Sequence, residues 1–179
     1  SKNLGCFGDG GALLFEDQQL ATKAKMIANH GQSIKYKHDI IGCNSRLDTL
    51  QAAVLLAKLP HLDDFNRRRN DVANYYDKAF ESTREITIPK RSLNSTHVFH
   101  QYTVKIEGID RDQLKQVLAD LEIPSMIYYP IPLHQQEAYK KHSSDSYPVT
   151  ENLSKTVLSL PIHTEMTKEQ LEHITTTVL

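Results

Sequence analysis

Residues 1–15 read SKNLGCFGDGGALLF, and this stretch decides the fold because it follows a lysine with a turn made mostly of glycine. The Gly-Asp-Gly-Gly run is typical of a tight turn, and Gly10 and Gly11 are expected to adopt positive φ where the chain reverses. The apolar residues 12–15 then predict a short strand. By its position alone Lys2 is a solvated terminal residue, so the rest of the sequence decides whether it has a role.

Composition and charge are those of an ordinary globular protein. The chain has 179 residues, of which 39% are hydrophobic and 24% charged, enough to bury one core or two small ones. The net charge of −1 gives no overall field that would favour nucleic acid or an anionic membrane. The basic run at 67–69 lies in a helical pattern that also carries Asp63, Asp64 and Asp71. It therefore predicts a solvated helix face.

Cysteine and histidine usage argues against disulfides and metals. Cys6 and Cys43 match neither a disulfide framework nor a zinc pattern, which predicts a reducing, cytoplasmic compartment. No apolar stretch approaches a membrane span and no signal peptide precedes the first motif, so no membrane partner is expected. His97 and His100 invite a metal interpretation, but on a strand a spacing of three points the two rings to opposite faces. No metal site is expected.

Hydrophobic periodicity predicts helices alternating with strands. Helices are expected at 17–30, 45–80, 111–121, 151–158 and 168–179, and strands at 85–89 and 97–106. Residues 124–134 predict a strand broken by Pro130 and Pro132, hence an exposed edge or a turn. Asp110 is a candidate N-cap, and Thr167 with Gln170 forms a candidate capping box. Pro60 should kink or divide the long helix, because proline lacks a backbone N–H.

Three parts follow from this pattern. Residues 84–179 could form a small α/β domain with its own core, and residues 47–83 form a long interdomain helix kinked near Pro60. Residues 1–46 hold one strand, one helix and a long loop, which is too little to enclose a core. They are expected to be the tail end of a larger domain, with Ile34, Tyr36, Ile40 and Ile41 of the loop buried.

Five segments, in order along the chain, carry a resemblance to a known family. They are SKNLGCFGDGGALLF (1–15), HDIIGCNSRLDTLQAAVL (38–55), HVFHQYTVKI (97–106), YYPIPLHQQEAY (128–139) and SLPIH (159–163). Together they resemble the DegT/DnrJ/EryC1/StrS family of sugar aminotransferases, which depend on pyridoxal 5′-phosphate (PLP). The resemblance covers essentially the whole chain. It implies an α/β, fold-type I PLP-dependent transferase, here the end of the large, PLP-binding domain plus the small C-terminal α/β domain.

The resemblance also gives Lys2 a role, because this family holds PLP on a lysine followed by Asn and a Gly-Asp-Gly-Gly turn. An amine that adds to an aldehyde must be unprotonated. Lys2 is therefore expected to hold the cofactor and to move a proton between the substrate carbon and the cofactor carbon. Family members that dehydrate sugars carry His at this position, so Lys2 favours transamination.

Five further site residues are implied by the resemblance. Asn44 is expected to donate to the PLP phosphate in the neighbouring subunit's active site, and Arg46 to lie near the substrate. Tyr128 and Tyr129, with His134 on the same turn, are expected to line the substrate pocket. From the residues alone, a capping Asn beside a surface Arg, and tyrosines packed on a strand, are open alternatives.

The implied function is amine transfer to a nucleotide-linked keto-sugar, in the biosynthesis of cell-surface polysaccharides or deoxyamino sugars. Glutamate is the expected amino donor, and the enzyme is expected to be a homodimer with shared active sites. Arg46 would suit a sugar that carries a carboxylate, such as a 3-keto-uronic acid. The chain would be the C-terminal portion of such an enzyme and inactive by itself, because nearly all other cofactor contacts of the family precede the lysine.

Two other functions stay open. In one, the chain is a non-catalytic α/β binding or assembly module, with residues 84–179 folding independently and the amino-terminal piece docking on a partner. In the other, it belongs to a PLP-dependent sugar dehydratase relative or regulator.

Overall fold

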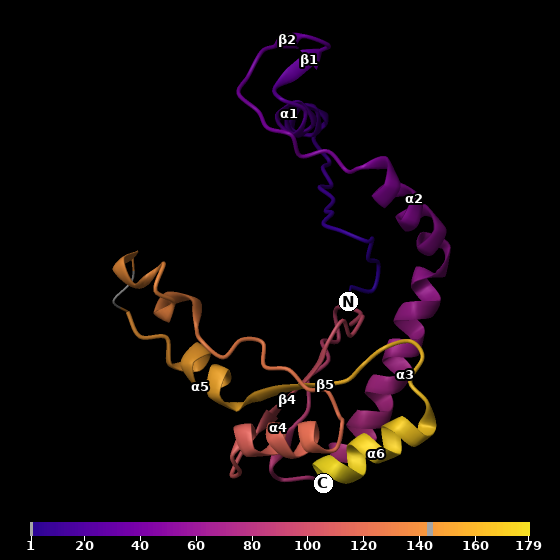
Figure 1. Cartoon of the computed structure of the whole chain (residues 1–179), viewed down its shortest axis with the longest axis vertical. Helices are drawn as coiled ribbons and strands as arrows, with labels where there is room; N and C mark the ends of the chain where they lie inside the picture. The colour runs from indigo at the N-terminus through magenta and orange to yellow at the C-terminus, as the bar shows by residue number, and fades with distance from the viewer. Residues whose placement is uncertain (1, 143–144) are drawn as a thin grey trace. The chain divides into compact units, whose positions relative to one another are not determined.

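The computed structural model describes residues 2–142 and 145–179, and the chain divides into two compact units, Ser1–Leu62 and Asp63–Leu179 (Figure 1). The first unit is a helix, a short hairpin and a second helix. Its elements are α1 (Gln18–Ala28), β1 (Gln32–Ile34), β2 (Lys37–His38), α2 (Thr49–Lys58) and the 3₁₀ turn η1 (Leu59–His61). The first helix begins where the sequence predicts, because the Asp17 side chain accepts from the N–H groups of Gln19 and Leu20. Pro60 lies in η1 and divides the helical segment as predicted.

The first unit has no hydrophobic core of its own. Among its described residues only Gly31 is buried, and neither α1 nor α2 has a buried side chain. The predicted burial of Ile34, Tyr36 and Ile41 is wrong, since they are 67%, 79% and 98% exposed. The predicted strand at 12–15 is also absent. A strand forms only where a neighbour supplies its hydrogen bonds, and none of the described residues pairs with this segment.

The second unit joins helices to a three-stranded antiparallel sheet of order β3-β4-β5. Its elements are α3 (Leu62–Phe80), β3 (Ile86–Thr87), β4 (Tyr102–Ile106), α4 (Arg111–Asp120), η2 (Leu133–Gln135), η3 (Lys140–His142), α5 (Pro148–Thr156), β5 (Val157–Leu160) and α6 (Lys168–Val178). Asp110 caps α4, and Thr167 with Gln170 forms the capping box of α6, both as predicted. Within the described ranges, no helix combines the length and the apolar character needed to cross a membrane.

The strands of this unit differ from the prediction in three places. β4 begins at Tyr102, so His97 and His100 precede the strand and the argument from opposite strand faces does not apply to them. Residues 124–134 form no strand; Met126 alone pairs there, by an isolated bridge to β5. The predicted helix at 151–158 ends two residues early, and its last turn is replaced by the start of β5. No cluster of three or more His, Cys, Asp or Glu side chains in the described residues could hold a metal.

The core of the second unit brings α3, α4 and α6 against the sheet. Tyr76 of α3 and Tyr102 of β4 are fully buried, and their rings meet at a tilt of 45° with centres 4.9 Å apart. The Tyr76 hydroxyl donates to the carbonyl of Pro161, and the Tyr102 hydroxyl to the Asp77 carboxylate, each at 2.8 Å. Burial raises the pKa of both tyrosines far above its ordinary value. This compact unit therefore includes α3, which the sequence pattern assigned to the interdomain helix at 47–83.

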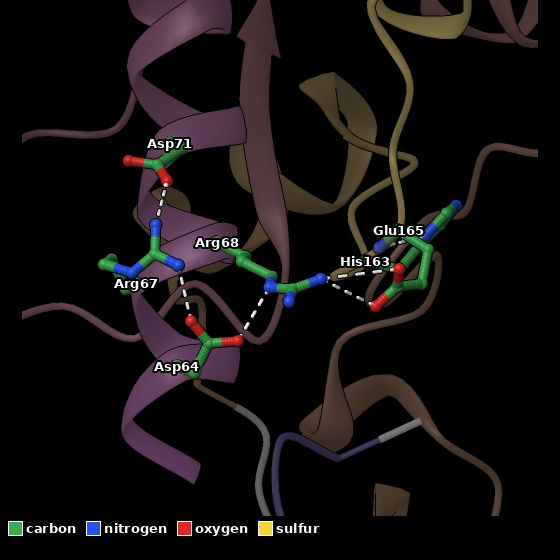
Figure 2. A network of polar contacts seen from close by, with 6 residues as sticks. All are labelled: Asp64, Arg67, Arg68, Asp71, His163 and Glu165. Carbon is green, nitrogen blue, oxygen red and sulfur yellow. Dashed lines mark hydrogen bonds and ion pairs between the residues drawn. The ribbon is translucent and has the colours of Figure 1, made fainter. Parts of the chain in front are cut away.

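Two arginines of the basic run lie on the exposed side of α3. Arg67 pairs with Asp64 and Asp71, one turn away on either side (Figure 2). Arg68 pairs with Asp64 and with Glu165 of the loop after β5. The hydrogen bond from Arg67 is the main cause that lowers the pKa of Asp64. These two residues form the solvated face that the sequence predicts.

Arg69 does not share that face. Its side chain is buried, with 8% of the residue exposed. Its Nη1 donates at 3.1, 3.2 and 3.2 Å to the carbonyl oxygens of Phe99, His100 and Ile162. The prediction of a solvated run is wrong for this residue, whose guanidinium ties α3 to the segments before β4 and after β5.

Candidate functional site

The predicted cofactor lysine begins a segment, residues 2–8 (the lysine segment), that is hydrogen-bonded to α2. The Gln51 side-chain oxygen accepts from the backbone N–H groups of Phe7 and Gly8 at 2.8 and 3.0 Å. A Cβ at Gly8 would lie 3.1 Å from the Gln51 amide nitrogen. The approach of Gln51 thus explains why a glycine suits this position.

A second α2 side chain binds Gly5, in the middle of the segment. Lys58 Nζ donates to the carbonyl oxygen of Gly5 at 2.6 Å, in a partly buried bond. A Cβ at Gly5 would lie 3.5 Å from the carbonyl oxygen of Lys2, so these two backbones are in contact. Because Gly5 meets the C-terminal end of α2 and Gly8 meets its first turn, the segment runs antiparallel to the helix.

The glycine turn (residues 8–11) does not have the predicted conformation. Neither Gly10 nor Gly11 has positive φ, so that prediction is wrong. A Cβ at Gly10 would lie 3.3 Å from both Cys6 Sγ and Leu47 Cδ1. Close packing, and not backbone conformation, explains the small residue at position 10.

The segment that carries Asn44 is attached to the C-terminal end of α1. The N–H of Cys43 donates to the carbonyl of Ile27 at 2.8 Å. The N–H of Ser45 donates to the carbonyl of Ala28 at 2.9 Å. Both bonds satisfy carbonyls that the last helical turn leaves without an intrahelical partner. The backbone on either side of Asn44 is fixed by this attachment.

Two glycines allow this attachment. Gly31 has φ of +74°, and a Cβ there would lie 1.7 Å from the carbonyl oxygen of Ile40. A Cβ at Gly42 would lie 2.2 Å from the Gly31 nitrogen. The two backbones therefore meet without space for a side chain on either.

Asn44 and Arg46 form an exposed polar pair. Arg46 Nε donates to Asn44 Oδ1 at 3.1 Å. The Asn44 amide NH₂ and the guanidinium nitrogens supply N–H donors of the kind that a phosphate or carboxylate needs.

A hollow of about 760 Å³ lies beside the glycine turn. It is lined by Asp9, Gly10, Gly11, Ala12, Leu13, Phe15, Ala21, Ala24, Lys25, Ala28, Ser45, Arg46 and Leu47. The structure thus brings Arg46 together with the glycine turn. Lys2 and Asn44 are not among the lining residues.

In the second unit, Tyr128 and Tyr129 line an apolar groove of about 530 Å³ (the tyrosine groove). Its other lining residues are Ile131, Pro132, Leu133, Gln136, Thr150, Leu153, Ser154 and Val157. The two rings meet edge to face with centres 5.6 Å apart, and the residues are 40% and 72% exposed. They are not packed in a strand, so the alternative of strand packing does not hold.

His134 lies outside the lining of this groove and binds α5 instead. Its Nε2 is 3.1 Å from Glu151 Oε1. The same carboxylate accepts from the backbone N–H of Tyr147 at 2.8 Å and from the Ser146 hydroxyl. The bond from Tyr147 is the main cause that lowers the pKa of Glu151, with smaller effects from His134 and Ser146. His134 and Glu151 thus join η2 to the start of α5, two walls of the groove.

Three residues of these sites escaped sequence reasoning. Gln51 and Lys58 are seven positions apart on a helix, which places them on one face. The sequence shows this spacing, but the backbone groups that the two side chains bind lie more than 40 positions away. Glu151 could be read only as an acidic residue near a helix start.

Comparison with known proteins gives a consistent result. The profile of the DegT/DnrJ/EryC1/StrS aminotransferase family matches residues 1–179. The chain is 40% identical over 178 residues to UDP-N-acetyl-3-dehydro-alpha-D-glucosamine 3-aminotransferase of Acidithiobacillus ferrooxidans, a match that covers 99% of this chain and 47% of that protein.

Two crystal structures are similar throughout this chain. The DesV protein of S. venezuelae, in complex with a ketimine intermediate, is 38% identical with a TM-score of 0.94 and covers 99% of this chain and 48% of its own. The NtdA protein of Bacillus subtilis, with bound cofactor PMP, is 28% identical with a TM-score of 0.90 and covers 99% of this chain and 42% of its own. The chain spans about half the length of the proteins it matches.

Proposed function

This chain belongs to the DegT/DnrJ/EryC1/StrS aminotransferase family, and we propose that it forms part of a PLP-dependent aminotransferase acting on a nucleotide-linked keto-sugar. The observation that carries the proposal is Lys2 with its glycine turn, within a match that covers the whole chain. A lysine at this position favours amine transfer over dehydration. The name of the Acidithiobacillus relative, which contains a UDP-linked 3-dehydro sugar, supports the substrate class.

The described residues fit the cofactor chemically. The primary amine of Lys2 suits an aldehyde, and the Asn44–Arg46 pair presents donors of the kind that a phosphate needs. When bound, PLP supplies an electron sink for the substrate carbon that loses its proton. Lys2 holds the cofactor aldehyde through Nζ and, once released, accepts that proton on Nζ and returns it.

The proposed enzyme is a homodimer with shared active sites. Asn44 donates to the cofactor phosphate in the neighbouring subunit, while Arg46 lies near the sugar and suits a substrate with a carboxylate. Tyr128 and Tyr129 provide apolar walls for the sugar, and His134 supports them through its bond to α5. Glutamate is the amino donor.

The burial pattern supports a further chain segment in the working enzyme. A unit of about 60 residues that has one buried residue among those the structure describes cannot offset the conformational entropy of its folding. Because the chain spans about half the length of its relatives, we assign the missing core to the remainder of the full-length protein. The two free cysteines fit a cytoplasmic location.

The test uses the full-length protein and its Lys2→Ala variant. The wild type should take up PLP with a visible absorbance band and, after borohydride reduction, carry the cofactor mass on the peptide that contains Lys2. The Lys2→Ala variant should show neither signal, whereas Lys23→Ala, which removes an exposed lysine of α1, should behave as wild type. A wild-type protein that never binds PLP would exclude the proposal.

A second assay separates the alternatives. Formation of 2-oxoglutarate from glutamate, dependent on a nucleotide-linked keto-sugar, is expected for a transaminase. Cofactor uptake without 2-oxoglutarate would favour the dehydratase or regulator, and absence of uptake the non-catalytic module.

A further inference from the structure

We infer that Gln51 and Lys58 of α2 are positioning residues that fix the lysine segment and, through it, the amine of Lys2. The inference rests on the proposed function, because it concerns the residue that holds PLP there. The first unit has one buried residue among those described, so apolar packing within the unit contributes little, and hydrogen bonds tie the segment to α2.

Gln51 fixes two successive peptide groups at once. Its single side-chain oxygen accepts from the N–H groups of both Phe7 and Gly8, as an amide oxygen with two lone pairs can. Adjacent peptide planes that share one acceptor have their directions set together. The absent side chain at Gly8 lets the amide come within this range.

Lys58 fixes the end of the segment nearer to Lys2. A charged donor forms a stronger bond to a carbonyl than a neutral donor does, and the bond to Gly5 is short, at 2.6 Å, and partly buried. Since the backbones of Gly5 and Lys2 are in contact, a shift of Gly5 is transmitted to Lys2.

The two anchors match the length of the segment between them. Gln51 and Lys58 lie seven residues apart, or about 10 Å along the helix axis. The three residue-to-residue steps from Gly5 to Gly8 span at most about 11 Å when the chain is extended. The stretch from Gly5 to Gly8 is thus held at both of its ends by α2, and Lys2 precedes it by three residues.

The experiment uses matched substitutions in the full-length protein. Gln51→Met and Lys58→Met keep the side-chain length but remove the acceptor and the donor, whereas Gln51→Glu and Lys58→Arg restore them. Gln19→Met and Lys23→Met are controls at exposed positions on α1. Each variant is measured for PLP dissociation constant, melting temperature and, without cofactor, the rate at which a lysine-directed reagent acylates Lys2, followed by peptide mass spectrometry.

We expect Gln51→Met and Lys58→Met each to raise the PLP dissociation constant about tenfold, the effect of losing one or two hydrogen bonds. Both should also change the rate at which Lys2 is acylated. The Glu and Arg variants should stay within about threefold of wild type, as should the controls. Unchanged PLP binding and unchanged Lys2 acylation in Gln51→Met and Lys58→Met would overturn the inference. So would a lowered melting temperature that the restoring variants correct without recovering PLP binding.

The two hypotheses fail in different ways. If the wild type does not bind PLP, the proposed function fails, and the acylation rate still reports whether α2 positions Lys2. If the wild type binds PLP, and Gln51→Met and Lys58→Met match it in PLP binding and in Lys2 acylation, only the positioning role fails.

Discussion

Replacing Arg69 with methionine should weaken the second unit far more than replacing either neighbouring arginine. The perturbation removes a buried guanidinium whose Nη1 donates to three carbonyl groups, while methionine retains most of the apolar stem. Those carbonyls would lose a donor inside the protein, and an unsatisfied buried acceptor is unfavourable.

The size of the expected loss in stability follows from the number of hydrogens on Arg69 Nη1. Nη1 carries two hydrogens, so its three contacts amount to two full bonds, each worth about 1.5–3 kcal/mol when the donor is charged. Relief of the buried charge offsets part of this, and burial indeed lowers the pKa of Arg69. A net loss of about 3 kcal/mol in the free energy that opposes opening of the second unit raises the equilibrium constant for opening roughly 100-fold.

The assay is amide hydrogen exchange by mass spectrometry on peptides covering β4 and β5, because a chain with two compact units need not unfold in one step. Arg68→Met is the matched control. Its partners are exposed, and exposed ion pairs contribute little. Arg69→Lys should be intermediate, since it keeps the charge with a shorter reach. Equal protection of β4 in Arg69→Met and Arg68→Met would refute the reasoning.

Three further predictions concern other elements. Gly31→Ala should strongly increase amide hydrogen exchange across the β1–β2 hairpin, because a Cβ would lie 1.7 Å from a carbonyl oxygen. Gly108 also has positive φ but lies in open space, so Gly108→Ala should lower the free energy of unfolding in urea by only about 1 kcal/mol. Tyr102→Phe should lower the stability of the second unit by about 1–2 kcal/mol in the same urea assay, since a buried hydroxyl bond to a carboxylate is lost. Glu151→Gln should lower the melting temperature at neutral pH: the pKa of this carboxyl in the folded state lies below the ordinary 4.5, so its stabilisation is present above 4.5 and declines as pH falls through the folded-state pKa. A difference from wild type that does not shrink as pH is lowered below 4.5 would contradict this last expectation.

Helix ends were predictable because the signals that fix them lie within a few residues. The cap at Asp110 and the capping box at Thr167 depend on backbone groups two or three positions away. Strands were less predictable, since their hydrogen bonds come from distant segments. Residues 12–15 have strand character without a partner, whereas β5, which the sequence assigned partly to a helix, is fixed by its pairing with β4.

Arg69 shows that some of the missed information was local. Val72, Ala73, Tyr76 and Phe80 lie three, four, seven and eleven positions beyond it, and all are buried. This is the spacing of one helix face. Grouping Arg69 with the two preceding arginines by charge hid the fact that its angular position on the helix belongs to the core.

The arrangement of the candidate site could not be predicted from residue spacing on one helix. The spacing of Gln51 and Lys58 shows that they share a face of α2, but it does not show what lies against that face. The segment they bind is separated from them by α1 and the hairpin, and its attachment depends on a close approach at Gly8 that one sequence cannot reveal. A glycine in a lysine-containing motif is naturally interpreted as serving the turn or the ligand. Here its backbone N–H serves the helix that orients the lysine segment, so the motif and α2 are better treated as one functional element.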